Sequence, residues 1–370
     1  MKKMIVLLAF AMFVGVLVAP MSVSAENYVA ISEMNFPDTK FREIIAQEFD
    51  TDDDTQLSGA EIMAVTTMDV SNAGIHDLTG IKYFTSLKEL YCQANHIVNL
   101  DVSNMATLEM LNCAGNWSVE LDEEGNPIEK LSVLNTSGCT SLTGLYCGLN
   151  GLTTLDVSNL TKLEGLYCQN NQLTEVNVKN NKELRYLTCG GNNLTSIDVS
   201  GMDKLIELHC TKLPNLTSLN VSGCVSLQSL QCRETAITTL DLKDCIQLTQ
   251  LSVSYNPYLK EIDVSHIKDL CSFTCHGNNL TKLVLNDRMK QAMEKGVKVY
   301  DSKENRDVYT LNLVEDNVPW YYFLSVNAGQ FQEKAPQTGD INSILWWTAL
   351  AFLSCGYLFC AYVLEKKRKK

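Results

Sequence analysis

Two consecutive stretches decide the fold: Leu142 to Lys162 reads LTGLYCGLNGLTTLDVSNLTK, and Leu163 to Glu183 reads LEGLYCQNNQLTEVNVKNNKE. Both are 21 residues long, and they keep their apolar residues at the same positions. Further copies begin at intervals of 21 or 22 residues, apart from one interval of 34. The opening leucines are Leu87, Leu108, Leu142, Leu163, Leu184, Leu205, Leu227, Leu248 and Leu270. A fixed period of this length indicates an array of structural repeats.

Each unit contains two sets of apolar residues. The run Leu166-Tyr167-Cys168 alternates between apolar and exposed positions, which is typical of a strand buried on one side. Leu173 and Val176 supply a second apolar set beyond the following turn. One 21-residue unit cannot bury both sets, whereas stacked units cover each other through parallel strands about 4.8 Å apart. The sequence therefore predicts a solenoid with a single shared core.

The consensus LxxLxCxxNxLxxLDVS resembles the bacterial leucine-rich repeat, and it is most similar to the internalin-type solenoids of surface proteins. The resemblance implies an α/β leucine-rich-repeat solenoid over residues 71–286, with a curved parallel β-sheet on its concave face. It also implies that one asparagine per unit bonds backbone groups at the turn. These asparagines are Asn95, Asn116, Asn150, Asn171, Asn192 and Asn278. The interval of 34 exceeds the usual 21 by 13 residues, which we predict to form a hairpin or loop turning near Gly125 and Asn126.

The two ends of the chain indicate export and anchoring. Residues 1–25 combine two lysines with an apolar run that ends in small residues, which predicts a cleaved secretory signal peptide. Residues 341–364 carry no charge, and as a helix they span about 36 Å, enough to cross a ~30 Å hydrocarbon core as a transmembrane helix. A tail at residues 365–370, one glutamate followed by five basic residues, comes next and is predicted to stay in the cytoplasm.

A short motif at residues 335–340, Ala-Pro-Gln-Thr-Gly-Asp, directly precedes the apolar span. The order of motif, span and basic tail resembles the LPxTG-type cell-wall sorting signal of Gram-positive surface proteins. The resemblance implies that a sortase cleaves between Thr338 and Gly339 and joins the chain to the cell wall. Ala335 stands where that family usually has leucine, and a plain membrane-anchored ectodomain is the alternative. Both interpretations place the repeats outside the cell.

The chain has 14 cysteines, and most of them occupy core positions of the repeat. Eight follow the strand leucine at the inward slot, where a free cysteine serves as a small apolar side chain. Neighbouring strands would hold these side chains farther apart than the roughly 3.5–4.5 Å that a disulfide needs between Cβ atoms. No CxxC or HxxxH pair is present, so the cysteines are not predicted to bind metal. We predict that they are free and buried.

Residues 26–70 are predicted to form a helical cap over the first repeat, because Phe41, Ile45 and Phe49 recur on one helix face. The stretch from Asp50 to Glu61 fits the twelve-residue calcium loop of EF-hand and dockerin-like segments. Its candidate ligands are Asp50, Asp52, Asp54, Gln56, Ser58 and Glu61. Thr55 stands where that loop uses glycine for a sharp turn. Ca²⁺ is therefore the one candidate cofactor, and a metal-free cap is the alternative.

Residues 287–334 follow the array. Val308 to Leu313 and Trp320 to Val326 alternate like two strands, which predicts a small β-rich C-terminal cap. A separate small binding module is the alternative.

The side chain between the strand leucine and the cysteine must point away from the core, onto the predicted concave face. From the N-terminal end, these residues are Tyr91, Asn112, Tyr146, Tyr167, Thr188, His209 and Gln231. The tyrosines provide large contact areas suited to protein recognition, and they also suit stacking on sugar rings. The alternative is an ordinary sheet surface, with the inserted loop carrying recognition.

Composition narrows the function further. A formal net charge of −13 argues against a nucleic-acid partner. The five histidines are scattered and no nucleophile motif or phosphate loop is present, so catalysis is not predicted. The sequence predicts a cell-surface protein that binds a host or neighbouring-cell protein, or mediates adhesion, through its concave face. A glycan-binding or structural cell-wall protein is the runner-up.

Overall fold

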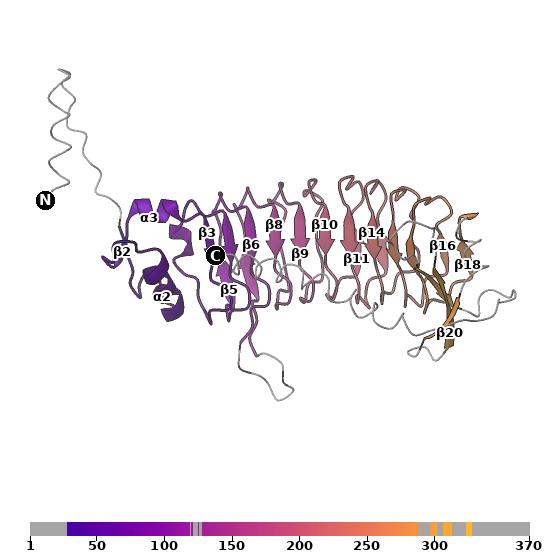
Figure 1. The fold of residues 1–370 in the computed structure, drawn as a ribbon, viewed down its shortest axis with the longest axis horizontal. Helices are drawn as coiled ribbons and strands as arrows, with labels where there is room; N and C mark the ends of the chain where they lie inside the picture. The colour runs from indigo at the N-terminus through magenta and orange to yellow at the C-terminus, as the bar shows by residue number, and fades with distance from the viewer. Residues whose placement is uncertain are drawn as a thin grey trace, which may run out of the picture.

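The computed structural model describes residues 28–118, 120, 125, 128–287, 289, 297–301, 306–312 and 323–327. Within these residues the chain winds into an elongated coil of stacked repeats (Figure 1). The predicted signal peptide, sorting motif, transmembrane helix and basic tail lie outside the described residues. No helix among the described residues has the length and apolar character needed to cross a bilayer.

One long sheet runs along the coil. It has 13 strands, and those from β3 to β17 are parallel and lie side by side in the sheet. They are β3 (Thr67–Asp69), β4 (Glu89–Tyr91), β6 (Met110–Asn112), β8 (Gly144–Tyr146), β9 (Gly165–Tyr167), β10 (Tyr186–Thr188), β12 (Glu207–His209), β14 (Ser229–Gln231), β15 (Gln250–Ser252) and β17 (Ser272–Thr274). Equivalent repeat positions pair, as Leu187 does with Leu166 and Leu208. The predicted parallel solenoid is therefore confirmed.

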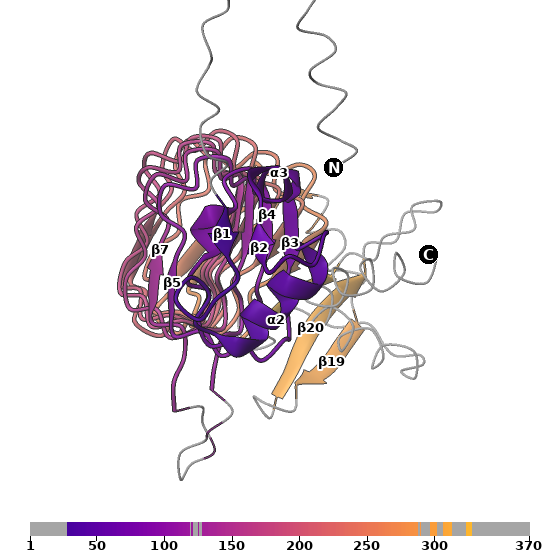
Figure 2. The same cartoon turned by 90° about the vertical axis from the view of Figure 1, so that its left-hand side faces the viewer.

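Short strand pairs lie on the opposite side of the coil (Figure 2). They are β5 (Asn99–Asp101) with β7 (Val133–Asn135), β11 (Ser196–Asp198) with β13 (Ser218–Asn220), and β16 (Glu261–Asp263) with β18 (Lys282–Val284). Each pair is parallel and forms a separate two-stranded sheet. The core fills the space between these pairs and the long sheet.

The core is a continuous cluster of leucines, valines, isoleucines and cysteines. Every cysteine that the structure describes is free, and all of these except Cys271 are buried. Burial raises the pKa of the Cys92 thiol to about 12, so that thiol stays neutral at physiological pH. The prediction of free, buried cysteines is confirmed for this part of the chain.

A ladder of asparagine side chains links successive turns of the coil. The Asn171 amide nitrogen donates to the carbonyl oxygens of Cys147 (2.9 Å) and Cys168 (3.1 Å). Its side-chain oxygen accepts from the backbone N–H of Leu152 (3.0 Å). The other predicted asparagines make equivalent bonds. Asn256 joins them, although the sequence pattern did not identify it.

The residue before each ladder asparagine adopts a left-handed backbone conformation, as do the residues before Leu213 and Thr235 at the same repeat position. The φ of these residues lies between 55° and 71° at Ala94, Gly115, Leu149, Asn170, Gly191, Lys212, Glu234, Tyr255 and Gly277. Only three of these nine residues are glycine, so the fold imposes this turn on side chains that disfavour it.

The N-terminal helical segment (residues 28–66) packs on the first repeat. It contains β1 (Val29–Ala30), α2 (Thr39–Glu48), β2 (Gln56–Leu57) and α3 (Gly59–Ala64). Asp38 caps α2 by accepting from the Phe41 N–H, and Phe41 and Ile45 are fully buried. The ring of Phe49 lies 5.7 Å from that of Phe84 in the adjoining repeat. The apolar side chains of the N-terminal helical segment belong to the same core as those of the repeats.

Three strands extend the long sheet beyond β17: β19 (Val297–Asp301), β20 (Arg306–Asn312) and β21 (Phe323–Asn327). β21 pairs in parallel with β17, and β20 pairs antiparallel with both β21 and β19. β20 and β21 overlap the two strands expected from the sequence.

The inserted segment after Asn116 leaves the coil as an antiparallel pair. Trp117 bridges Lys130, and the Ser118 N–H donates to the Glu129 carbonyl oxygen (2.8 Å). This is the base of a hairpin, as predicted. The turn itself falls largely outside the described residues.

Candidate interaction surface and acidic loop

The seven predicted binding residues form one row across the long sheet. Strand register pairs them in order from Tyr91 with Asn112 to His209 with Gln231. Each is partly exposed, whereas the leucine before it and the cysteine after it are buried. We call this row and its outward neighbours the sheet face.

Tyr146 and Tyr167 are stacked at the centre of the sheet face. Their ring centroids lie 4.4 Å apart and their planes differ by 5°. Each ring runs back over a glycine of its own strand: a Cβ added at Gly165 would lie 3.0 Å from Cε2 of Tyr167, and one at Gly144 would lie 3.4 Å from Cε2 of Tyr146. Because glycine has no side chain, the recurring Gly-Leu-Tyr triplet leaves space for each tyrosine ring over the glycine of its own strand. The Gly-Leu-Tyr triplet is visible in the sequence, but the pattern of tyrosines alone did not predict that the glycines leave space for the rings.

The tyrosine half of the sheet face is nearly uncharged, and Glu89 beside Tyr91 is its charged group. The Tyr91 hydroxyl donates to Oε2 of Glu89 (3.2 Å), and burial together with that carboxylate raises the pKa of Tyr91 to about 12. Burial and the neighbouring Tyr146 also raise the pKa of Tyr167. These phenols stay protonated at physiological pH. Protein-binding surfaces commonly have such an aromatic centre that lacks charge.

The other half of the sheet face is more polar. The His209 side chain is 16% exposed, and its Nε2 lies 3.9 Å from Oε2 of Glu207. Burial lowers the pKa of His209, although Glu207 acts in the opposite direction. Farther along, the hydroxyl groups of Ser252 and Thr274 are 2.7 Å apart. This half offers small polar side chains where the first half offers rings.

Ion pairs lie along the edge of the sheet face, just before the strands begin. Lys88 pairs with Glu109 (3.1 Å), and Lys204 pairs with Glu183 (2.5 Å). The Arg185 guanidinium carbon lies 6.0 Å from the centroid of the Tyr186 ring. An uncharged centre with a charged border is the usual arrangement of a protein–protein interface.

The acidic loop brings three of the predicted calcium ligands together. One carboxylate oxygen from each of Asp50, Asp52 and Asp54 lies within 4.8 Å of the other two. Thr55 has a φ of 67°, so the sharp turn expected at this position is present although the residue is not glycine. Desolvation and the nearby charges of Asp54, Glu61 and Asp50 raise the pKa of Asp52.

The remaining predicted ligands are engaged elsewhere. Both oxygens of Glu61 accept hydrogen bonds, one from the N–H and hydroxyl of Thr51 (2.7 and 2.6 Å) and the other from those of Ser58 (2.8 and 2.9 Å). Ser58 caps α3 in a capping box with Glu61. The backbone of Gln56 pairs with that of Ala30.

The three aspartates offer hard oxygen donors of the kind Ca²⁺ prefers. A twelfth-position ligand would require Glu61 to give up the bonds from Thr51 or Ser58. The calcium site therefore remains a prediction, in which Asp50, Asp52 and Asp54 would hold the ion.

Comparisons with known proteins agree with this architecture. No family model matches the chain. Over 68 residues the chain is 37% identical to Internalin J of Listeria monocytogenes serotype 4b, and this segment is 18% of the chain and 7% of Internalin J. Among solved structures, a leucine-rich-repeat protein of Leptospira interrogans matches with a TM-score of 0.51 and 18% identity, over 64% of this chain and 60% of that one. The chain has a leucine-rich-repeat fold.

A solved internalin from Listeria monocytogenes is 20% identical, over 70% of this chain and 92% of that one, with a TM-score of 0.43. The 68 residues that match Internalin J support the resemblance to internalins that the repeat consensus indicated. That segment is a small part of Internalin J, so the comparison does not carry the whole protein's activity to this chain.

Proposed function

We propose that the chain is a cell-surface protein, anchored to the wall or membrane, that binds a protein ligand or mediates adhesion through its sheet face. The observation that carries this proposal is the uncharged aromatic centre of that face, bordered by ion pairs. Tyr91, Tyr146 and Tyr167 supply large contact areas with few rotatable bonds, which is favourable in the centre of an interface.

The stacking of Tyr146 on Tyr167 favours a protein ligand over a glycan. A sugar ring binds to the open face of an aromatic ring, but these two rings cover each other's inner faces at a centroid distance of 4.4 Å. Each ring keeps its edge and at most one face for contact. Such edges suit the side chains and backbone of a protein surface.

The ligand class can be tested with arrays. The full chain is applied to an array of surface and secreted proteins and, separately, to an array of polysaccharides and wall fragments. We expect saturable capture on protein spots. Capture by saccharides alone would contradict the proposal and would favour the runner-up, a glycan-binding or structural wall protein.

Anchoring rests on the sequence segments outside the described residues, namely the signal peptide, residues 335–340 and the apolar span. In a Gram-positive host that expresses sortase, we expect the chain in the wall fraction. Exchange of Thr338 and Gly339 for alanine should move it to the membrane fraction. Recovery of both forms from the membrane would support a plain membrane anchor instead.

A further inference from the structure

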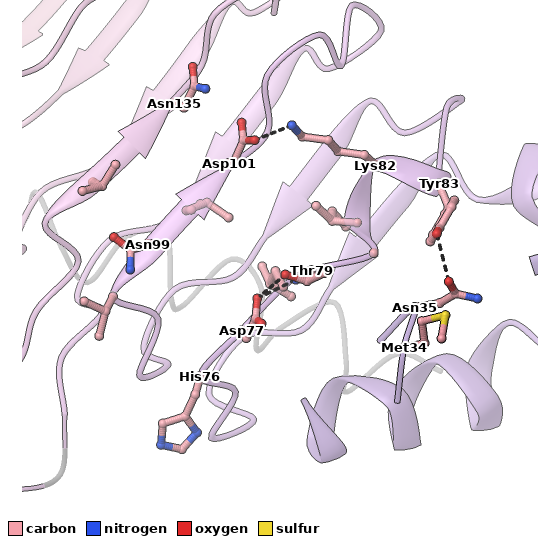
Figure 3. Close-up of a pocket in the computed structure, with 16 residues that line it drawn as sticks. Met34, Asn35, His76, Asp77, Thr79, Lys82, Tyr83, Asn99, Asp101 and Asn135 are labelled. Carbon is pink, nitrogen blue, oxygen red and sulfur yellow. Dashed lines mark hydrogen bonds and ion pairs between the residues drawn. The ribbon is translucent and has the colours of Figure 1, made fainter. Parts of the chain in front are cut away.

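A groove with a volume of about 980 Å³ lies beside β5 (Figure 3), on the side of the coil opposite the sheet face (Figure 2). One wall is the edge of β5 with the outer residues of β7, and the other is formed by residues 76–83 and by Met34 and Asn35 of the N-terminal helical segment. Buried Leu78, Ile81 and Leu100 line it as well. None of these residues belongs to the sheet face or to the acidic loop.

The groove exists because the repeat before β5 is attached to the N-terminal helical segment. Oδ2 of Asp38 accepts from the backbone N–H groups of His76 (2.8 Å) and Asp77 (3.3 Å). Gly80 has a φ of 103°, and a Cβ there would lie 2.4 Å from the Phe36 ring and 2.5 Å from the Asn35 carbonyl oxygen. Residues 76–83 therefore pack against the N-terminal helical segment. They form the short helix η1 (Ile81–Tyr83) in place of a strand beside β5.

The edge of β5 that faces the groove is unpaired. Among the strands that the structure describes, β5 pairs with β7 alone, in a parallel register that aligns Asn99 with Val133 and Asp101 with Asn135. The Val98 carbonyl oxygen and the Val102 N–H bond β7 on either side of this pairing. Because alternate residues of a parallel strand bond the same neighbour, Asn99 and Asp101 direct their N–H and carbonyl groups to the opposite side. Among the described residues, none of these four backbone groups has a hydrogen-bond partner.

Apolar side chains stand exposed on both walls of the groove. Met34 is 89% exposed, Val133 54% and Tyr83 38%. Tyr83 is held in place by its hydroxyl, which donates to Oδ1 of Asn35 (3.1 Å). An unpaired strand edge flanked by exposed apolar side chains is the arrangement that accepts an added strand.

The charge of the groove is unbalanced. Lys82 reaches across one end to Oδ2 of Asp101 (2.5 Å) and to the hydroxyl of Ser103 (2.8 Å). Asp77, on the opposite wall, accepts from the N–H and hydroxyl of Thr79 (both 2.7 Å) and forms no ion pair with any described residue. One carboxylate thus remains uncompensated, in a chain whose formal net charge is −13. A segment with a basic residue would complement it.

We propose that this groove binds an extended peptide segment of a partner protein, which adds as a strand to the free edge of β5. Its backbone pairs with Asn99 and Asp101, its apolar side chains contact Met34, Tyr83 and Val133, and a basic side chain faces Asp77. This surface is separate from the sheet face, so the chain has two surfaces for protein ligands on opposite sides of the coil.

The experiment selects nine-residue random peptides displayed on phage against the full chain, and then measures the affinity of the selected peptides as synthetic probes. Asn99→Pro removes the N–H that faces the groove and leaves the groups of Leu100 that pair with β7. The matched control is Ser196→Pro, at the same position of β11, which has the same pairing with β13 and lies outside the groove. We expect the selected peptides to contain alternating apolar residues and a basic residue, and to lose at least tenfold in affinity for Asn99→Pro only.

A second variant guards against misfolding. Met34→Asp alters a side chain that is already in solvent, so it should leave the melting temperature unchanged and weaken the same peptides. N-methylation of alternate peptide residues should abolish binding in one register and preserve it in the other, because only one edge of an added strand meets β5.

Several results would overturn the proposal: no enriched peptide, equal losses for Asn99→Pro and Ser196→Pro, displacement of the peptides by saccharides, or concentration-dependent dimers in sedimentation that are disrupted by Met34→Asp. Replacing Tyr91, Tyr146 and Tyr167 by serine should leave peptide binding intact. The failure of either surface can therefore be distinguished from the failure of the other.

Discussion

In both the repeat array and the acidic loop, side chains form hydrogen bonds with backbone N–H or carbonyl groups. The two regions use different side chains for this. In the array, neutral asparagines such as Asn171 each bond two carbonyl groups and one N–H, and the arrangement recurs from repeat to repeat. In the acidic loop, charged Asp50 and Glu61 accept the N–H groups of Asp54, Thr55, Thr51 and Ser58 within one short segment. The stability of the array should therefore depend mainly on its internal hydrogen bonds. The stability of the loop should depend on pH and on bound cations.

The largest expected effect is in the array. Asn171→Ala would leave the Leu152 N–H without a partner, and the carbonyl oxygens of Cys147 and Cys168 would keep only their bonds from the neighbouring ladder asparagines. One unsatisfied buried group costs about 1–3 kcal/mol, so we expect a loss of about 1–3 kcal/mol in the free energy of unfolding. Denaturant unfolding of the full chain measures it. Asn159→Ala, at an exposed position, is the control and should change little. A loss below about 1 kcal/mol for Asn171→Ala would show that the ladder is not a main source of stability.

The next effect is in the acidic loop and depends on pH. Hydrogen bonds from Thr51 and Ser58 lower the pKa of Glu61 from 4.5 to about 2. Because this pKa is depressed in the folded state, the carboxylate stabilises the fold above pH 4.5, and that contribution is lost as the pH falls towards 2.

Glu61→Gln should therefore lower the melting temperature at pH 7, and the difference from wild type should vanish near pH 2. Thermal melts of both proteins across this range give the comparison. A difference that is constant with pH would mean that Glu61 acts through packing alone.

Calcium binding provides a second test of the acidic loop. If Asp50, Asp52 and Asp54 hold the ion, millimolar Ca²⁺ should raise the melting temperature, because a ligand that binds only the folded state stabilises it. Asp52→Asn should reduce the increase, whereas the exposed control Asp203→Asn should not. Calorimetric titration without heat, together with an unchanged melting temperature, would end the calcium prediction.

The smallest effect concerns the left-handed turns. Leu149 in the array and Thr55 in the loop have φ values of 59° and 67°. Glycine avoids the cost of about 1–2 kcal/mol that other residues pay there, but it loses about 0.5–1 kcal/mol through greater freedom in the unfolded chain. We expect Leu149→Gly to stabilise the protein by about 0.5–1 kcal/mol and Thr55→Gly by somewhat more, since threonine is β-branched. Destabilisation of both variants in denaturant unfolding would contradict this estimate.

Much of the array could be predicted from the sequence, because its period follows from burial. Leu166 and Cys168 alternate around Tyr167 for a reason that holds in every repeat, and the outward row from Tyr91 to Gln231 follows from the same alternation. The Asn256 rung was missed because Val253 replaces cysteine three residues earlier and obscures the repeat motif.

Features that depend on contacts between distant segments could not be predicted. The stacking of Tyr146 on Tyr167 requires the register between β8 and β9 as well as the glycines beneath the rings. The groove beside β5 arises because Asp38 and Phe36 hold a segment about 40 residues later in the chain. In the loop, the sequence indicated the aspartates, but it could not show that Thr51 and Ser58 occupy both oxygens of Glu61.

Binding of a protein ligand by the sheet face can be measured with variants of its tyrosines. Wild type, a variant with Tyr91, Tyr146 and Tyr167 replaced by serine, and Tyr258→Ser, at a 60% exposed tyrosine away from that face, are compared on the same protein array. We expect the triple variant to keep a cooperative melting transition and to lose capture at least tenfold, while Tyr258→Ser matches wild type. Unchanged capture by the folded triple variant would show that these tyrosines do not form the binding surface.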